Sequence, residues 1–281
     1  MSPTATEARH ETFSVDAKGT QLSVHRWSPP QEEPKAQLLV LHGYAEHAGR
    51  YREFALNLAP RGIEVTVPEL RGHGHSEGPR GHVHEYDDYV IDAETTFRTL
   101  TGPAPRFVLG HSNGGLVALD YVDRRPPPIA GLILTNPFLE LEIKQPALKM
   151  MAGRLAAKIY PKLAVPSGIP AETISRDPEI VAAYARDPLV FTTATVGYAV
   201  AQEKTSARVQ AMTRIEAALL YIYSDSDPLV SPAANAHLAA QLQSPDKTVW
   251  ERADEKHEVL NELNRTQLHG DIADWILQRS G

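Results

Sequence analysis

Two short segments of the chain carry a serine in the pattern G-x-S-x-G, at residues 74–78 and 110–114. In some enzymes this pattern places a serine hydroxyl at a sharp turn, where it can attack a carbonyl carbon. A serine hydroxyl is a weak nucleophile, so it needs a histidine to take its proton and a carboxylate to orient that histidine. The two serines, Ser76 and Ser112, therefore raise the question of which one has such partners.

The residues around the two serines favour Ser112 as the nucleophile. An apolar run at 106–109 leads directly into Ser112, and a segment with helical spacing follows it, as a strand-to-helix turn requires. Ser76 lies in the glycine-rich segment 71–83, where no helix can begin for several residues. A carboxylate at Glu77 would also oppose the negative charge that forms on an attacked carbonyl oxygen. We predict that Ser76 is a loop residue.

His257 is the predicted general base. It follows the last strand-like run and precedes the last helix, so its side chain can reach the edge of a sheet. The competing histidines lie in less suitable places: His237 and His269 in predicted helices, His10 in an irregular start, His25 within a strand, and His111 beside the serine.

The predicted acid is Asp227, in the segment SDSDPLVS that follows the apolar run 217–223. An Asp-Pro pair initiates a turn, which places this carboxylate beyond the tip of the strand. Asp225 is the alternative acid, and Asp254 is a more remote third choice.

Two backbone amides are predicted to bind the oxyanion. One is the N–H of Asn113, the residue after the nucleophile, and the other is the N–H of Tyr44, which follows the His42-Gly43 turn after an early strand. The alternative is that His42-Gly43 is only a turn.

The composition excludes several other kinds of function. The chain has 281 residues, a net charge of −7 and no long basic run, so we expect no nucleic-acid partner. It contains no cysteine, which excludes disulfides and thiolate sites. The paired histidines at 73 and 75 and at 82 and 84 lack a carboxylate at ligand spacing, so we predict no metal and no cofactor. With no signal peptide or apolar span, a cytoplasmic protein is expected.

Apolar, strand-like runs alternate with segments of helical period, which predicts an α/β fold with a mostly parallel sheet flanked by helices. The predicted helices are 51–62, 88–100, 116–125 and about 258–279, and the predicted strands are 21–27, 38–43, 63–70, 106–112, 129–137, 217–225 and 247–254.

Residues 138–208 interrupt this alternation and show no clear strand, which predicts a helical insertion, the cap, between core segments 1–137 and 209–281. In its helical stretch 148–163, Leu148, Leu155 and Ile159 share one face, while the basic side chains lie largely on another. Either this helix packs on its own domain, or it meets acyl chains or a membrane surface.

Several segments together resemble the monoacylglycerol lipase and lysophospholipase-like branch of the α/β-hydrolase superfamily, over nearly the whole chain. They are HGYAEHAGRY, RGHGHSEGPRGHV, GHSNGG, SDSDPLV, KHEVLNE and, in the cap, ISRDPEIVAAYARDPLV. The resemblance implies a triad of Ser112, Asp227 and His257 with oxyanion amides at Tyr44 and Asn113. Asn113 stands where the branch usually has Met, and this polar side chain is expected at the pocket floor, where it would alter acyl-chain preference.

The resulting hypothesis is a serine hydrolase that cleaves carboxylic esters of lipid-like alcohols, foremost monoacylglycerols, through an acyl-enzyme. A general carboxylesterase or a lysophospholipase of the same mechanism is the alternative. A non-catalytic ligand-binding member of the fold is a more remote one. The substrate is a small-molecule ester, and a transient contact of the cap with a membrane surface is the further partner to be tested.

Overall fold

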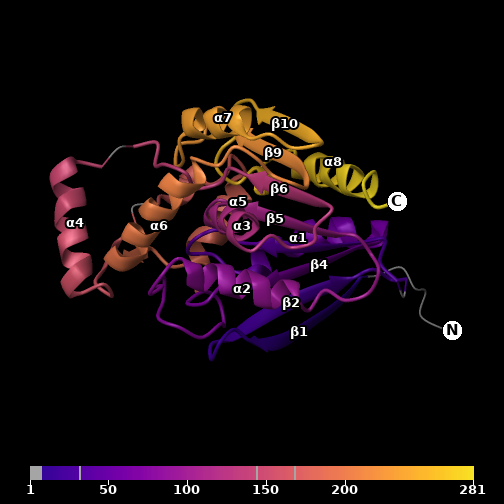
Figure 1. Ribbon diagram of the computed structural model, residues 1–281, viewed down its shortest axis with the longest axis horizontal. Coiled ribbons are helices and arrows are strands. Elements are labelled where there is room, and N and C mark those ends of the chain that lie inside the picture. Colours follow the sequence, from indigo (N-terminus) through magenta and orange to yellow (C-terminus); the bar gives the residue numbers. More distant parts are fainter. Residues whose placement is uncertain (1–7, 32, 144, 168) are drawn as a thin grey trace.

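The computed structural model describes residues 8–31, 33–143, 145–167 and 169–281. Eight strands form the central sheet in the order β1-β2-β4-β3-β5-β6-β9-β10 (Figure 1). The strands from β4 to β10 run parallel, whereas β2 pairs antiparallel with β1 and with β4. They are β1 (Arg9–Asp16), β2 (Gln21–Ser28), β3 (Ala36–Leu41), β4 (Ile63–Pro68), β5 (Arg106–His111), β6 (Gly131–Thr135), β9 (Ala218–Ser224) and β10 (Lys247–Arg252).

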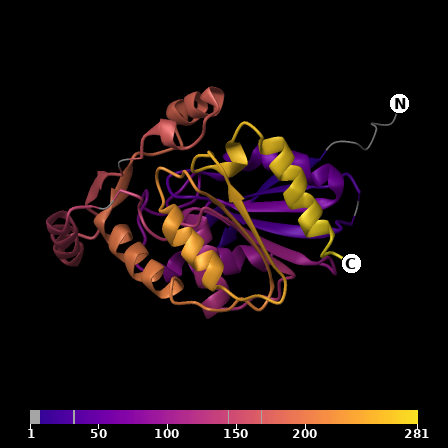
Figure 2. The same ribbon diagram turned by 90° about the horizontal axis from the view of Figure 1, so that it is seen from above.

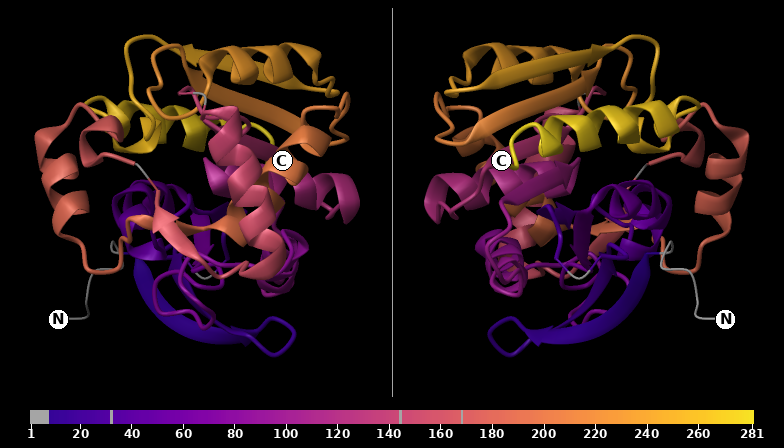
Figure 3. Two further views of the ribbon diagram at one scale, coloured as in Figure 1. Left: turned by 90° about the vertical axis from the view of Figure 1, so that its left-hand side faces the viewer. Right: turned by 90° about the vertical axis from the view of Figure 1, so that its right-hand side faces the viewer.

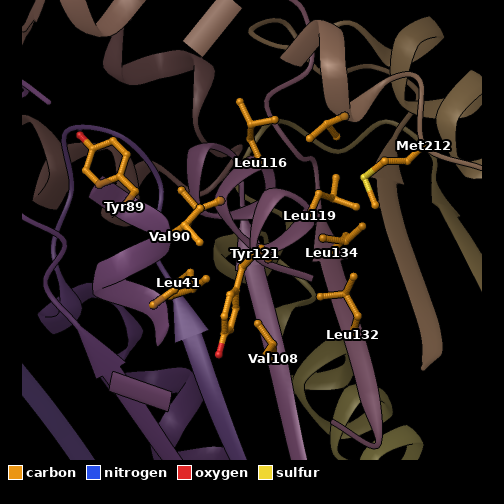
Figure 4. Close-up of a cluster of buried hydrophobic side chains, with 14 of the residues drawn as sticks. Leu41, Tyr89, Val90, Val108, Leu116, Leu119, Tyr121, Leu132, Leu134 and Met212 are labelled. Atoms are coloured by element: carbon orange, nitrogen blue, oxygen red, sulfur yellow. The ribbon is translucent and has the colours of Figure 1, made fainter. Parts of the chain in front are cut away.

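Both faces of the central strands are buried, which explains their continuous apolar sequences. Side chains alternate along a strand, so neighbouring residues enter different cores. In β3, Leu39 and Leu41 belong to one cluster and Leu38 and Val40 to the other. Figure 4 shows part of the first cluster, with Leu41, Val108, Leu132 and Leu134 from the sheet facing Leu116 and Leu119.

Helices cover each face of this sheet (Figures 1 and 2). Residues of α2, α3 and α7 complete the first cluster, and residues of α1 and α8 complete the second. The helices of the core are α1 (Arg52–Leu58), α2 (Asp87–Phe97), α3 (Asn113–Arg124), α7 (Pro232–Gln241) and α8 (Arg265–Leu277), with short 3-10 turns η1 (Ala48–Tyr51), η2 (Ala59–Arg61) and η4 (Val259–Asn261). The predicted α/β fold class, a mostly parallel sheet flanked by helices, is confirmed.

The chain between β6 and β9 leaves the sheet and forms most of the left-hand part of Figure 1. It contains α4 (Ala147–Ile159), β7 (Ala164–Pro166), η3 (Ala171–Thr173), α5 (Pro178–Arg186), β8 (Thr193–Thr195) and α6 (Val196–Val209). The expectation that this segment lacks strands is wrong, because β7 and β8 form a small antiparallel ladder. Three-residue strands are too short to show a periodic pattern. The boundaries 138–208 for the cap stay a prediction.

Helix α4 stands apart from the core at the left of Figures 1 and 2, and it lies in front of the core in the left view of Figure 3. It has no buried residue, and Leu148, Leu155 and Ile159 expose 73%, 62% and 75% of their surface. Its described contacts are mainly with α6, including an ion pair between Arg154 and Glu203. The apolar face predicted from the sequence therefore faces outward and does not pack on the core.

Two other sequence expectations need correction. His10 does not lie in an irregular start, since Arg9–Asp16 forms the edge strand β1, which pairs with β2. The last helix begins at Arg265, seven residues later than predicted, because the 3-10 turn η4 occupies Val259–Asn261. No helix in the described parts of the chain is long and apolar enough to cross a membrane.

Candidate active site

Ser112 occupies a strained turn between β5 and α3. Its backbone angles are φ 52° and ψ −118°, a combination that non-glycine residues rarely adopt. The start of α3 packs so closely on the end of β3 that a Cβ at Gly114 would overlap the carbonyl oxygen of Leu41. A glycine is therefore required there, and the G-x-S-x-G pattern is explained by this close approach.

The imidazole of His257 lies between Ser112 and Asp227. Its Nε2 is 2.8 Å from Ser112 Oγ, and its Nδ1 is 2.7 Å from Asp227 Oδ2. A carboxylate can only accept a hydrogen bond, so Nδ1 carries the proton and Nε2 accepts from the serine hydroxyl. All three side chains are buried, with 8%, 6% and 2% of Ser112, His257 and Asp227 exposed. These are the groups and contacts that a nucleophile, its base and an orienting acid require.

These three residues come from loops at one edge of the sheet. Ser112 follows β5, Asp227 follows β9 and His257 follows β10, and parallel strands end at the same edge. Asp227 is held in place by the N–H groups of Leu229 and Val230, which donate to its Oδ1 at 2.8 and 3.1 Å. Asp225, the alternative acid, is exposed and accepts from Ser226 Oγ and the N–H of Asp254.

The surroundings of His257 favour its protonated form. Burial alone would lower the pKa of His257, but the charge and hydrogen bond of Asp227, together with the charges of Glu258 and Glu46, raise this pKa above the usual value of 6.5. The neighbouring His111 behaves in the opposite way, since burial and the nearby His257 lower its pKa to about 4. His111 therefore remains neutral beside a base that can take up a proton.

Asn136 was missed by the sequence reasoning. It follows β6 with φ 42°, and its Nδ2 donates to the carbonyl oxygen of His257 at 2.6 Å. Its Oδ1 accepts from the N–H of Ser224 at 2.8 Å. The side chain thus joins the ends of β6 and β9 to the histidine loop. The only signal was the segment Thr135-Asn136-Pro137 at a strand end, which indicates a turn and no more.

The two residues predicted to supply oxyanion amides both lie near Ser112. Asn113 is the first residue of α3, where an N–H has no acceptor within the helix. Tyr44 lines the same pocket as Ser112 and His257. The preceding amide, that of Gly43, is already used, because it donates to Glu46 Oε1 at 2.5 Å. The carboxylate of Glu46 therefore holds the turn that presents Tyr44.

A buried network of charges connects this turn to the histidine loop. Arg50 donates to Glu46 at 2.8 Å and to both carboxylate oxygens of Glu258 at 2.6 Å. Tyr51 also donates to Glu46, at 2.9 Å. Burial raises the pKa of Glu46, but the charge of Arg50, the nearby His111 and His42 and the hydrogen bond from the Gly43 amide together lower it to about 2, so Glu46 is ionised. Sequence reasoning missed this network because Glu258, which completes it, is 208 positions from Arg50.

The pocket above Ser112 is narrow and mostly apolar. It encloses about 60 Å³ of space that water can occupy. Its walls come from the core and from the segment between β6 and β9, which contributes Leu141, Ile169, Ile174 and Tyr184.

The side chain of Asn113 is turned away from the predicted pocket floor. It is fully buried, and its Oδ1 accepts from Tyr86 Oη at 2.8 Å and Tyr198 Oη at 3.0 Å. The amide therefore joins α3 to α6.

The remaining candidates have structural contacts. Ser76 Oγ donates to the carbonyl oxygen of Glu69 and accepts from the N–H of Ser23, so it ties the glycine-rich loop to β2. His73 Nδ1 contacts the carbonyl oxygen of Arg71, and His82 Nδ1 contacts Thr195 Oγ1. Within the described ranges, no three His, Cys, Asp or Glu side chains are arranged to hold a metal ion.

Sequence comparison finds relatives along nearly the whole chain. The family described as "Serine aminopeptidase, S33" matches residues 32–264. The monoacylglycerol lipase of Mycolicibacterium smegmatis is 31% identical and aligns with 97% of this chain and 98% of its own length. The human monoglyceride lipase is 30% identical (95% of this chain, 90% of its own), as is phospholipase YtpA of Bacillus subtilis (85% and 94%).

Comparison of structures agrees on the fold. The crystal structure of the Paleococcus ferrophilus monoacylglycerol lipase superimposes with a TM-score of 0.84, covering 96% of this chain and 99% of that one at 24% identity. With the family match and the full-length relatives, the chain belongs to the serine aminopeptidase S33 family of the α/β-hydrolases, as a carboxylic ester hydrolase of the monoacylglycerol lipase-like branch.

Proposed function

We propose that this chain hydrolyses monoacylglycerols to a fatty acid and glycerol through a Ser112–His257–Asp227 triad. The observation that carries the proposal is the pair of hydrogen bonds, 2.8 and 2.7 Å long, that joins these three side chains beneath a mostly apolar pocket. The full-length relatives named for monoacylglycerol lipase activity support the choice of substrate.

The proposed reaction has two halves. His257 Nε2 takes the Ser112 proton while Oγ attacks the ester carbonyl carbon, and the amides of Tyr44 and Asn113 bind the oxyanion. His257 then gives that proton to the departing glycerol oxygen, which leaves an acyl group on Ser112. Water, deprotonated by His257, attacks the acyl carbonyl and releases the fatty acid. Asp227 holds the imidazole and balances its positive charge.

Substrate entry requires the walls of the pocket to separate. Sites for drug-sized ligands usually have about 300–1,000 Å³, far more than the 60 Å³ available here. The wall residues Ile169, Ile174 and Tyr184 lie on residues 169–186, around η3 and α5, so this part of the segment must move to admit an acyl chain.

We assign the exposed face of α4 to a membrane surface. Leu148, Met151, Leu155 and Ile159 each expose more than 60% of their surface, and Lys149, Arg154 and Lys158 on the same helix are also exposed. An apolar face flanked by cations suits the surface of an anionic bilayer, where monoacylglycerols reside.

The test is a hydrolysis panel with matched variants. We expect wild-type protein to cleave monoacylglycerols faster than lysophospholipids and short-chain p-nitrophenyl esters. Ser112→Ala should lose at least about 10⁴-fold of this activity. Ser76→Ala, the same change in the other G-x-S-x-G segment, should keep it. Faster cleavage of lysophospholipids or short esters would favour the phospholipase or carboxylesterase alternative. Absence of turnover and of labelling by a fluorophosphonate would indicate a non-catalytic binder.

A further inference from the structure

Tyr198 on α6 contacts both residues whose amides are assigned to the oxyanion. Its ring stacks on that of Tyr44, with centroids 4.1 Å apart and planes 18° from parallel. Its hydroxyl donates to Asn113 Oδ1 at 3.0 Å. Only 3% of Tyr198 is exposed, so both contacts are shielded from water. One side chain of α6 thus contacts both Tyr44, which lines the pocket of Ser112, and Asn113, which follows Ser112 in the chain.

Each of these contacts is part of a packed arrangement. Tyr44 Oη shares its one proton between the carbonyl oxygens of Gly81 at 2.8 Å and Thr193 at 3.2 Å, which holds its ring against Tyr198. Asn113 Oδ1 also accepts from Tyr86. Burial raises the pKa of Tyr198 well above its usual value, so its hydroxyl keeps the proton that it donates.

The contacts of Asn113 leave one of its side-chain atoms without a hydrogen bond, which costs stability. Its Nδ2 is buried without a hydrogen-bond partner among the described residues. An unsatisfied buried amide lowers stability. The Asn113 carboxamide offsets this loss of stability only through the hydrogen bonds that its Oδ1 accepts from Tyr86 and Tyr198.

Helix α6 is itself attached to the core. Arg208 pairs with Asp120 of α3, Ser206 donates to the carbonyl oxygen of Leu139, and Gln202 donates to that of Phe138 at 3.2 Å. At its first turn, Thr195 Oγ1 accepts from the N–H of Tyr198. The position of Tyr198 therefore depends on how α6 packs on α3 and on residues 138–139.

We infer that Tyr198 is a positioning residue that sets the distance between the amides of Tyr44 and Asn113 through its ring on one side and its hydroxyl on the other. The inference rests on the proposed function, in which these amides bind the oxyanion. Oxyanion donors act over a narrow range of about 2.7–3.1 Å, so small displacements of either residue weaken them. Such an effect appears in the chemical step and leaves ground-state binding unchanged.

The test separates the hydroxyl from the ring. Tyr198→Phe removes the hydrogen bond and keeps the stacking, whereas Tyr198→Leu removes both. We expect kcat to fall about 3- to 10-fold in the first and about 30- to 100-fold in the second, less than the 10²- to 10³-fold loss of a whole oxyanion donor, with KM unchanged. The Ki of an alkyl trifluoromethyl ketone, whose adduct carries an oxyanion, should rise by the same factors.

A double-mutant cycle tests whether the Tyr198 hydroxyl affects kcat through its hydrogen bond to Asn113. In an Asn113→Leu background, Tyr198→Phe should cause no further loss, because its acceptor is gone. The control is Tyr221→Phe, which removes another buried tyrosine hydroxyl that donates to a buried asparagine, Asn235, at 2.8 Å. This control should lower the denaturation midpoint as Tyr198→Phe does and leave kcat unchanged.

The outcomes distinguish this inference from the proposed function. Ester turnover that is absent in wild type or survives Ser112→Ala overturns the proposed function and the inference with it. If ester turnover does depend on Ser112, three results overturn the inference alone. The first is an unchanged kcat in Tyr198→Phe, and the second is a rise in KM of that variant without a change in kcat. The third is an equal loss of kcat on adding Tyr198→Phe to the wild type and to Asn113→Leu. If Tyr198→Leu does not fold, the Tyr198→Phe cycle still decides, because phenylalanine keeps the volume of the ring.

Discussion

Arg50 and Glu258 form a bidentate ion pair beside His257, with both N–O distances at 2.6 Å, although they are 208 positions apart in the chain. The same guanidinium binds Glu46, which holds the amide of Gly43. One buried cation therefore connects the loop of the candidate oxyanion amide with the loop of the candidate base. The side chain of Tyr184 packs on this guanidinium at 4.8 Å, which shields it further.

Replacing Arg50 should destabilise the fold strongly. Arg50→Met leaves two buried carboxylates without a cation, so we expect the free energy of unfolding to fall by about 3–5 kcal/mol. Chemical denaturation measures the change. Arg214→Met, in the exposed pair with Glu216, is the control and should shift the midpoint little. Adding Glu46→Gln and Glu258→Gln to Arg50→Met should restore part of the loss, and an unchanged midpoint in Arg50→Met would contradict the role of the network.

The pH dependence of kcat/KM should report His257. The reaction needs the neutral imidazole, and the pKa of His257 is raised, so activity should increase with pH through a limb centred above 6.5. Asp227→Asn should shift this limb downward and lower kcat by about 10⁴-fold. Asp225→Asn is the matched control and should change neither the position of this limb nor kcat. A limb below 6.5 in wild type would be inconsistent with the Asp227–His257 contact.

The same raised pKa predicts a trend in stability. A group whose pKa is higher in the folded chain stabilises that chain most when it is protonated. The contribution of His257 is therefore complete below pH 6.5 and is lost as the pH rises through its folded pKa. The denaturation midpoints of wild type and His257→Gln are measured across a range of pH. As the pH rises, the midpoint of wild type should fall relative to that of His257→Gln. A difference that does not vary with pH would contradict it.

Gly81→Ala should disturb the site through Tyr44. Gly81 has φ +58°, and a Cβ there would lie 2.2 Å from Tyr44 Oη. We expect a loss of about 2–4 kcal/mol in stability, from backbone strain and overpacking together, and a fall in kcat. Gly102→Ala also has a positive φ but open space around it, so it should show the backbone cost alone, with kcat unchanged. Equal effects of the two changes would argue against a contact with Tyr44.

Removing the apolar face of α4 should weaken binding to vesicles. We expect the combined change Leu148→Ser, Leu155→Ser and Ile159→Ser to reduce cosedimentation with anionic vesicles at least about tenfold. Hydrolysis of a water-soluble p-nitrophenyl ester should be retained, since none of these residues lines the pocket. Val249→Ser with Leu263→Ser changes exposed apolar residues outside this segment and should leave vesicle binding intact. Undiminished binding of the triple variant would contradict the assignment to a membrane surface.

The strands and helices of the core could be predicted because their signals are local. Apolar runs in β3, β5 and β9 and helical spacing in α1 to α3 reflect burial of one or both faces. The Ser112 turn was also predictable, because the apolar run before it and the helical spacing after it adjoin it in the sequence, although the contact that requires glycine at Gly114 is with Leu41 of β3. The sequence did not predict strands β1, β7 and β8. Strand β1 is largely exposed and β7 and β8 have three residues each, so none of them shows an apolar pattern.

What the amino-acid sequence determined by itself was the α/β fold class and the set of candidate residues, Ser112, Asp227 and His257, because each stands at the end of a recognisable strand. Only the tertiary structure decided which atoms meet. Parallel strands bring loops 145 positions apart to one edge, where His257 comes within 2.8 Å of Ser112. The contacts of Asn136, Arg50 and Tyr198 arise from packing between distant elements, and such contacts leave no periodic or spaced pattern along the chain.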